Sequence, residues 1–533
     1  MLSPYGFTPI LVDTYTAIPT PPGLRRLLEQ LLTYSATAQG KRTWLETARG
    51  YHWCWRIRPP LRRPSIATWL SSDNTRGPRQ DRGRLHQEKL GNGELVDIGA
   101  NWIHGTTDNP MLDIAKQTGT AVGVWDSKAS IYDESGTLYL NKECDQYTDV
   151  MWDIIQDAFR CSDQSSAEIN EHKSLFDFFR EKVEEKIPDT EPGFQKKRET
   201  VLKMSEMWGT FVGSPIAKQS LKFFWLEECI EGENLFCAGT YKKILEVIAK
   251  PALDGASIKF NSVAERISYR SDPGDEVKVQ LRGGRTLSFD EVVVTTPLGW
   301  LQKNLAAFEP PLPARLTKAI NSIGYGCLEK VYISFPKAFW LATEEDDTTV
   351  QGFIQWIAPT YDPENNPKQW IQEVVELATI APEAAHPTLL FYIYGEQSEY
   401  ITSTVAGLDS PESKNKFLLD FFKPYYSRLP HYSESSADCQ PAFTLATNWL
   451  RDELAGNGSY SNFQIGLEHG DEDVKTMRQG LPDHGLWLAG EHTAAFAVLG
   501  TVTGAYWSGE SVGRRIAEMY GLPKRKAQDK TRL

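Results

Sequence analysis

The sequence predicts an α/β fold, and three features of the region after residue 86 carry that prediction. Residues 257–270 and 276–297 alternate apolar and polar side chains, a Gly-Gly pair marks a hairpin turn, and "EVVVTTP" predicts a buried strand. Residues 174–187 and 413–429 carry apolar side chains at helical spacing. Near the C-terminus, a short strand in "GLWLAG" leads through a loop to a helix that ends before Gly521. Strands and helices mixed in this way indicate α/β architecture.

Composition narrows the class of protein. The chain has 533 residues, of which 41% are hydrophobic and 24% charged, as in soluble globular proteins. No run of 18 apolar residues occurs, so no membrane span is expected, and residues 1–23 lack the pattern of a secretory signal. The net charge of −13 disfavours nucleic acid as a partner and suits a cationic substrate.

The cysteines indicate a reducing compartment and no metal site. There are seven, with no C-x-x-C pair and no zinc-like His/Cys spacing. The sequence therefore predicts a cytoplasmic protein without a metal. A peroxisomal location is the alternative, because the ending "TRL" faintly resembles the S-K-L signal after a basic stretch.

Residues 487–516 hold the first pattern with chemical content. A strand ends at Gly490, Glu491 and His492 follow, and Gly500 precedes a helix whose first turns are small residues. Small residues at a helix N-terminus let a flat or anionic ligand approach the backbone N–H groups, where the helix dipole favours negative charge. Tight packing of the helix against a sheet explains the same glycines, and both readings stay open on this segment alone.

Four further segments accompany it in order: "VDIGANWIHG" at 96–105, "FDEVVVTTPLGWLQKN" at 289–304, "CLEKVYISFPKAFW" at 327–340 and "GSYSNFQIG" at 458–466. Together the five resemble the flavin-containing amine oxidases, with polyamine oxidases the nearest in appearance, over about residues 85–520. The resemblance implies an α/β fold with a Rossmann-like FAD-binding domain of discontinuous segments (86–120, 237–305 and 444–520). It also implies an α+β substrate-binding domain (121–236 and 306–443). Residues 1–85 are expected to be irregular and 521–533 to form a basic tail.

The implied reaction is oxidation of a polyamine, such as spermine, spermidine or an acetylated form. Non-covalent FAD and molecular oxygen would give an aminoaldehyde, an amine and hydrogen peroxide. Lys330 matches the family lysine that holds a water near the flavin; a lone lysine is normally a surface charge, but this context predicts a buried one with a lowered pKa. His104 would stand at the substrate mouth, and Tyr506 would face the amine.

The resemblance also places the cofactor and substrate contacts. Those to the cofactor are Gly99, Ala100, Asn101 and Trp102 on the flavin face, Trp449 as an aromatic wall, Thr501 and Val502 at the pyrimidine edge, Gly490 and Glu491 at the C-terminal motif, and Val263 at the adenine. Substrate contacts would come from Tyr460 as a second wall and from Glu227 and Glu228, which could bind remote ammonium groups. A solvated acidic loop is the alternative for the two glutamates.

Other members of the same fold fit less well. Monoamine-oxidase-like relatives attach FAD through a C-terminal cysteine, but no cysteine follows Cys439. A histone-demethylase relative would carry a long helical hairpin, and no sustained heptad pattern is present. An amino-acid oxidase needs an arginine for the substrate carboxylate, which the sequence does not identify. An inactive or FAD-deficient product is the alternative from another class.

That last alternative rests on residues 50–82, where the N-terminal FAD signature is missing. The family should begin with a strand, Gly-x-Gly-x-x-Gly, a helix and an acidic residue on the second strand. The stretch instead reads "GYHWCWRIRPPLRRPSIATWLSSDNTRGPRQDR". Tryptophan has the single codon TGG, so a reading one base later converts Trp53 and Trp55 to glycine, and Arg58 permits a third at the right spacing. The sequence therefore indicates a frame-shifted reading of an intact FAD-binding unit.

Overall fold

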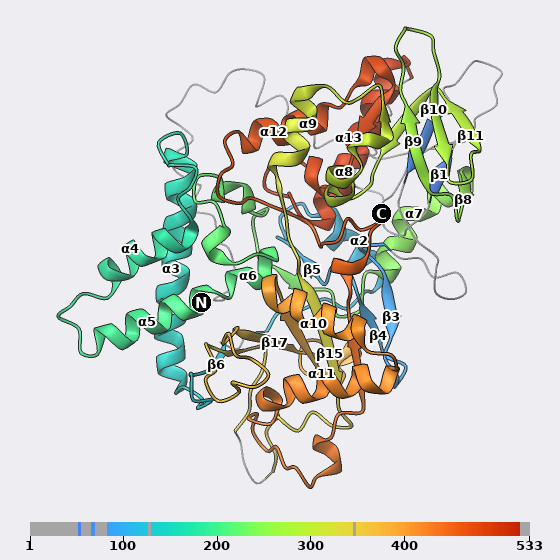
Figure 1. Cartoon of the computed structure of the whole chain (residues 1–533). Coiled ribbons are helices and arrows are strands. Elements are labelled where there is room, and N and C mark those ends of the chain that lie inside the picture. Colours follow the sequence, from blue (N-terminus) through green and yellow to red (C-terminus); the bar gives the residue numbers. More distant parts are fainter. Residues whose placement is uncertain (1–51, 55–65, 70–82, 126–128, 345–347, 523–533) are drawn as a thin grey trace.

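The computed structural model describes residues 52–54, 66–69, 83–125, 129–344 and 348–522, which are arranged around two large sheets (Figure 1). The first sheet has the strand order β21 (Leu486–Leu488), β12 (Glu291–Val294), β2 (Ile66–Trp69), β1 (His52–Cys54), β8 (Ser257–Lys259). The second has the order β19 (Phe443–Ala446), β15 (Glu329–Ser334), β18 (Thr388–Ile393), β17 (Gln372–Glu376), β16 (Phe353–Trp356), β6 (Ser130–Tyr132).

Strand direction in the five-stranded sheet changes part-way across. Strand β12 runs parallel to β21 and to β2. Strand β1 runs antiparallel to both of its neighbours, β2 and β8. Two short strands thus lie in a segment that the sequence led us to expect as irregular. A strand–helix–strand unit would have placed parallel strands there instead.

The hairpin prediction is confirmed. Strands β9 (Ala264–Ser268), β10 (Val277–Leu281) and β11 (Thr286–Phe289) pair antiparallel in sequence order, and β13 (Phe308–Glu309) adds to β9. Gly283 and Gly284 form the turn with φ of 91° and 86°, a region that glycine enters without steric cost. All four residues of β12 are buried, as the run "EVVV" predicts.

The six-stranded sheet is covered on both faces by helices. Helices α10 (Gly395–Gly407) and α11 (Pro411–Tyr426) pack on one face (Figure 1). On the other face lie α3 (Asn141–Ser165), α4 (Leu175–Lys186), α5 (Phe194–Ser205) and α6 (Trp208–Val212). Every residue of β15 to β18 is buried, because helices cover both faces of this sheet.

The predicted helices begin at well-formed caps. Ser174 and Asp177 form a reciprocal capping box at α4. Helix α13 (Val502–Met519) starts at Thr501, whose hydroxyl accepts from Gly504 N at 3.0 Å. Among the residues with described coordinates, no helix is both long and apolar enough to cross a membrane.

Smaller elements complete the fold. The helices are α2 (Pro110–Thr118), α7 (Lys242–Gly255), α8 (Leu298–Lys303), α9 (Ala314–Ser322) and α12 (Gly470–Gln479); the strands are β3 (Gln87–Lys89), β4 (Leu95–Asp97), β5 (Trp102–Ile103), β7 (Leu235–Phe236), β14 (Gly324–Tyr325) and β20 (Ser461–Asn462).

Candidate active site

Lys330 connects the six-stranded sheet to residues 97–101. It lies on β15 and is 5% exposed. Its ammonium group donates to the carbonyl oxygens of Asp97 (3.3 Å) and Gly99 and to the side-chain oxygen of Asn101. All three acceptors belong to the segment that leads into β5. A lysine with these contacts fixes the position of residues 97–101 against the sheet.

Burial shifts the pKa values of both Lys330 and Asp97. Burial lowers the pKa of Lys330, with Asp97 and Glu329 opposing the shift. Burial raises the pKa of Asp97, whose carboxylate accepts from Tyr241 N at 3.0 Å and from the Gln87 side chain at 2.7 Å. A lysine that loses its proton more readily than usual can exchange protons near neutral pH.

Aromatic side chains surround the lysine. The Tyr392 ring centroid is 5.8 Å from the Lys330 nitrogen, and its hydroxyl donates to Asn101 at 3.0 Å. Trp102 donates from its indole nitrogen to the Tyr392 hydroxyl at 3.2 Å and stacks on Phe353 at 5.8 Å between centroids. The Trp102 ring thus packs toward the six-stranded sheet, and its place on the flavin face stays a prediction.

Glu491 anchors a second group of polar contacts. Arg84 is paired with it at 2.9 Å, and Ser461 donates to it from its backbone N–H (3.3 Å) and its hydroxyl (2.5 Å). Burial alone would raise the pKa of Glu491, but Arg84, His492 and Ser461 hold it below its usual value. The prediction from sequence missed Arg84. Its only signal was the position of "GRL", directly after the anomalous stretch.

The chain segments at Arg84 and Gly99 pack closely against each other. A Cβ at Gly99 would lie 1.6 Å from the carbonyl oxygen of Arg84, so only glycine allows these two chain segments to cross. Ala100 N donates to the same carbonyl at 3.1 Å. The Glu491 contacts and the Lys330 contacts are therefore connected through residues 84–101.

The start of α13 faces this region with the features of an anion site. The first N–H groups of a helix have no partner within the helix. Gly504 is required there, because a Cβ would lie 2.0 Å from the Val498 carbonyl oxygen. Tyr460 packs near Gly500, and its hydroxyl donates to the Phe211 carbonyl. Neither ring nitrogen of the buried His492 has a hydrogen-bond partner among the described residues.

These residues fit the ring end of a flavin. A helix N-terminus, a glycine cradle and an unpartnered buried histidine suit a flat ligand that carries negative charge. At the expected nucleotide end, β1 and β2 do not form the parallel pair of a strand–helix–strand unit, because β1 runs antiparallel to β2 and to β8.

Comparison with known proteins decides the family. The model of the family "Flavin containing amine oxidoreductase" matches residues 79–517. The chain belongs to this family. The predicted flavin amine oxidase fold is also confirmed: a solved structure of a putrescine oxidase variant covers 85% of this chain and 93% of its own, with a TM-score of 0.59 and 15% identity.

Relatives within the family differ in their named activities. Human lysine-specific histone demethylase 2 is 28% identical over 455 residues, which are 82% of this chain but 49% of that protein. The chain spans about half the length of the demethylases it matches. Probable polyamine oxidase 4 of Arabidopsis thaliana is 24% identical over 469 residues, which are 85% of this chain and 83% of that protein.

Two further predicted site residues of this amine oxidase fold are His104 and Tyr506. Burial lowers the pKa of His104 to about 4, so the ring is neutral, and its Nδ1 is buried without a partner in the described chain. Tyr506 packs against the buried cluster that contains Leu85 and Ile103, and its hydroxyl bonds to Glu510 one turn further along α13. Its role as the residue facing the amine stays a prediction.

Two further predicted contacts also stay predictions. Trp449 is half-buried beside the main core. Val263 directly precedes β9 and accepts from Arg282 N at 2.7 Å through its carbonyl, and the contact of its backbone with the adenine stays a prediction.

Glu227 and Glu228 differ in their surroundings. One oxygen of Glu227 accepts from Gln219 (3.1 Å) and from Phe463 N (3.3 Å), and burial raises its pKa to about 7. Glu228 is half-buried, and burial together with Asp163 raises its pKa. Neither glutamate has a described contact with Lys330, and their place in substrate binding stays a prediction.

Proposed function

We propose that this chain is an FAD-dependent oxidase of polyamines. The buried Lys330, held on β15 against Gly99 and Asn101, is the observation that carries the proposal. Its position matches the motif lysine of the family. A structural lysine would normally keep its charge in solvent, whereas this one is desolvated and has a lowered pKa.

The residues of this chain would bind, orient and handle protons. FAD, when bound, supplies the acceptor for the hydride that leaves the carbon next to the amine nitrogen. The N-terminus of α13 favours negative charge at one edge of the ring. Lys330 can hold or release a proton beside it while water converts the iminium to an aldehyde and an amine. Molecular oxygen takes the two electrons and two protons and leaves as hydrogen peroxide.

Several observations support a cationic substrate and a non-covalent cofactor. The chain carries a net charge of −13, and a polyamine oxidase aligns over most of its own length. No cysteine lies among residues 440–533, so the C-terminal segment offers no thiol for covalent attachment. Oxygen and a small cationic amine are the partners we propose, and the cytoplasm is the proposed location.

Hydrogen peroxide release from a panel of amines tests the proposal. Purified protein, supplied with FAD, should oxidise spermine or spermidine with a higher kcat/KM than benzylamine, because a polycation gains from each buried carboxylate it meets. A preference for benzylamine would contradict the polyamine assignment. No peroxide from any amine would contradict oxidase activity.

A methylated lysine in a peptide is the second candidate substrate. It is favoured by the demethylase relatives, whose matched regions cover 81–82% of this chain. The described helices include no long hairpin insertion, and the longest is α3 with 25 residues. A dimethyl-lysine histone peptide in the same assay separates the two: turnover of the peptide above that of spermine would favour this alternative.

A further inference from the structure

Glu329 is a buried carboxyl group directly next to Lys330 in the chain. It is the first residue of β15 and is 1% exposed. Side chains alternate along a strand, so Glu329 and Lys330 point to opposite faces. Lys330 reaches residues 97–101, whereas Glu329 reaches residues 447–450. The chemistry proposed for Lys330 makes no use of Glu329, although burying a carboxyl group is costly unless its hydrogen bonds are completed.

The carboxyl group of Glu329 holds the chain where it leaves the six-stranded sheet. Strand β19 pairs with β15 and ends immediately before Thr447. The Thr447 hydroxyl donates to one oxygen of Glu329, and Leu450 N donates to the other at 2.8 Å. Thr447 is also tied to the backbone of Lys330: its N–H donates to the Lys330 carbonyl at 2.9 Å, and its hydroxyl accepts from Lys330 N at 2.8 Å.

The turn that follows β19 has no cap of its own. Its residues form the short 3-10 helix η6 (Trp449–Arg451), and the side chain of Asn448, which precedes it, makes no capping hydrogen bond within the described chain. The first N–H groups of a helical turn need acceptors from outside the turn. The carboxylate of Glu329 supplies one of them from β15, so the position of η6 depends on Glu329.

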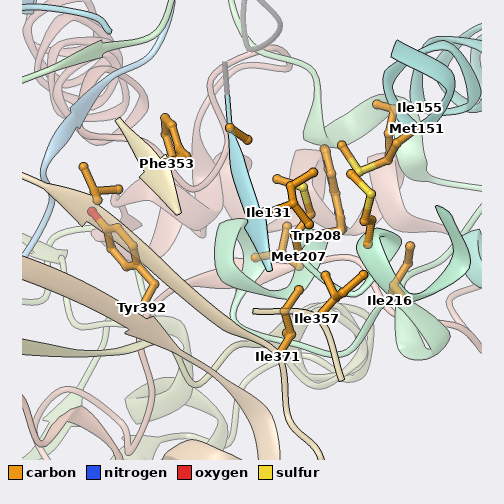
Figure 2. Close-up of a cluster of buried hydrophobic side chains, with 14 of the residues drawn as sticks. Ile131, Met151, Ile155, Met207, Trp208, Ile216, Phe353, Ile357, Ile371 and Tyr392 are labelled. Atoms are coloured by element: carbon orange, nitrogen blue, oxygen red, sulfur yellow. The ribbon is translucent and has the colours of Figure 1, made fainter. Parts of the chain in front are cut away.

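This turn carries an aromatic side chain toward the surroundings of Lys330. Trp449 packs against the buried apolar cluster of which Figure 2 shows a part, and Tyr392 and Phe353 belong to that cluster. Tyr392 is also the ring whose centroid lies 5.8 Å from the Lys330 nitrogen. A shift of residues 447–450 would therefore disturb the packing beside the lysine.

Glu329 also acts on Lys330 through its charge. Burial raises the pKa of Glu329 to about 7, while the hydrogen bonds from residues 447–450 oppose the shift. When ionised, Glu329 favours the protonated form of Lys330, so it raises the pKa of Lys330 against the effect of burial. The other ionisable groups that face this pair are Asp97 and Tyr392 near Lys330, and Cys327 and Asp452 near Glu329.

We propose that Glu329 is a positioning residue of the candidate active site. Its carboxyl group holds residues 447–450, and with them Trp449, against β15, and its negative charge helps Lys330 to keep a proton. The inference rests on the proposed function, in which Lys330 handles protons. Glu329 acts through these other residues, and we assign it no contact with the substrate or the cofactor.

Two variants separate the hydrogen bonds of Glu329 from its charge. Glu329→Gln keeps an oxygen that can accept from Leu450 N but carries no charge, whereas Glu329→Leu loses both. Hydrogen exchange of residues 447–452 in the full-length protein, followed by mass spectrometry, reports the hydrogen bonds. Exchange should be at least about tenfold faster in Glu329→Leu than in the wild type, and within about threefold of the wild type in Glu329→Gln.

The charge is measured at Lys330 itself. NMR of full-length protein labelled with ¹³C at the lysine ε-carbon gives the pKa of Lys330, whose signal is identified by its loss in Lys330→Met. Glu329→Gln should lower this pKa by about 0.5 or more, because a neighbouring negative charge that favours the protonated lysine is removed. A residue with a merely structural role would leave the pKa of Lys330 unchanged.

Glu376→Gln is the matched control. Glu376 lies on β17, is 0% exposed, and accepts from the Thr379 hydroxyl and from Ala378 N at 2.8 Å. It therefore receives the same kinds of hydrogen bond as Glu329, but its described contacts include neither Lys330 nor residues 447–450. Its substitution should change neither measurement, and melting temperatures verify that the variants fold.

The outcomes distinguish this role from the proposed function. Wild-type exchange in Glu329→Leu, or an unchanged pKa of Lys330 in Glu329→Gln, would overturn the role of Glu329. Glu329→Gln keeps the test decisive if Glu329→Leu does not fold. Peroxide release from spermine, together with either contrary result, would leave the oxidase assignment standing. If both measurements give the expected results but no amine yields peroxide, the role of Glu329 stands and the oxidase assignment falls.

Discussion

At the scale of single residues, the candidate active site depends on buried ionisable groups. Lys330 satisfies its N–H donors with oxygens from residues 97–101, and Glu491 is held by Arg84 and Ser461. Burial makes each group sensitive to its partners, because charges interact more strongly away from water. Substitutions at these positions should therefore separate proton handling from cofactor retention.

Lys330→Met should slow the oxidation of spermine, or the subsequent reoxidation by oxygen, by at least about a hundredfold, since a positioned proton donor or acceptor is lost. The flavin should remain bound, because the Glu491 contacts are untouched. Stopped-flow absorbance measures both half-reactions. Lys368→Met, at an exposed pair with Glu396, serves as the control. Wild-type rates in both half-reactions would remove Lys330 from the mechanism.

Glu491→Ala should reduce flavin occupancy more than Glu227→Ala does. The change leaves Arg84, whose side chain is 25% exposed, without its carboxylate, and should lower the free energy of unfolding by about 2 kcal/mol. The flavin-to-protein absorbance ratio after gel filtration gives the occupancy. The reverse order of the two variants would show that our assignment of cofactor and substrate contacts is wrong.

Glu373 should make stability depend on pH. Burial raises its pKa from 4.5 to about 7, so the folded state binds this proton more tightly than the unfolded chain. That contribution is complete below pH 4.5 and is lost as the pH rises through about 7, by up to about 3 kcal/mol. Across the six-stranded sheet, Glu373 lies opposite Tyr392, which in turn lies opposite Lys330. Tyr394 also interacts electrostatically with Glu373.

Urea unfolding between about pH 5 and pH 8 tests this prediction. The slope of the unfolding free energy against pH reports the difference in bound protons between the unfolded and folded states. Glu373→Gln cannot titrate, so its stability relative to the wild type should increase across this range. A difference that does not vary with pH would mean that Glu373 stays ionised throughout.

At the scale of elements, sequence periodicity predicted strands and helices better than it predicted contacts. The hairpins of β9 to β11, the capped helix α4 and the strand–loop–helix at α13 follow from local patterns. The contacts of Arg84 and the position of Glu373 could not be predicted from local sequence patterns. The partner of Arg84 lies 407 residues away, and the position of Glu373 depends on strand register, which is set by tertiary pairing.

Gly504 tests whether the start of α13 must pack this closely. Gly504→Ala places a Cβ against the backbone carbonyl of Val498, so the helix must move, at a cost of about 1–3 kcal/mol and with loss of flavin occupancy. Gly407→Ala, at the end of α10 with open space around it, should be neutral or slightly stabilising. Thermal unfolding of both variants measures the difference, and equal effects would argue against a tightly packed site.

At the scale of the whole molecule, the five-stranded sheet holds two strands from the anomalous segment. Strands β2 and β1 occupy the positions between β12 and β8, and β1 opposes both neighbours. A strand–helix–strand unit, as the shifted reading encodes, would make both parallel to β12 and bring a helix N-terminus to the pyrophosphate.

The transcript should resolve this anomaly. Read one base out of register, the codons for residues 50–82 should specify Gly-x-Gly-x-x-Gly without a stop, with a compensating slip near Gly83. Restoring that frame should strengthen FAD binding by several kcal/mol, about what multiple charge-assisted hydrogen bonds provide. Stop codons in the shifted reading would exclude the explanation, as would full flavin retention by the chain as it stands.

The flavin absorbance near 450 nm, a property of the bound cofactor, reports oxidation of a polycationic amine. Spermine is added without oxygen to the FAD-reconstituted protein, with benzylamine as the comparison. Spermine should bleach the band, and should do so faster than benzylamine. A band that spermine leaves unchanged, or that benzylamine bleaches faster, would contradict it.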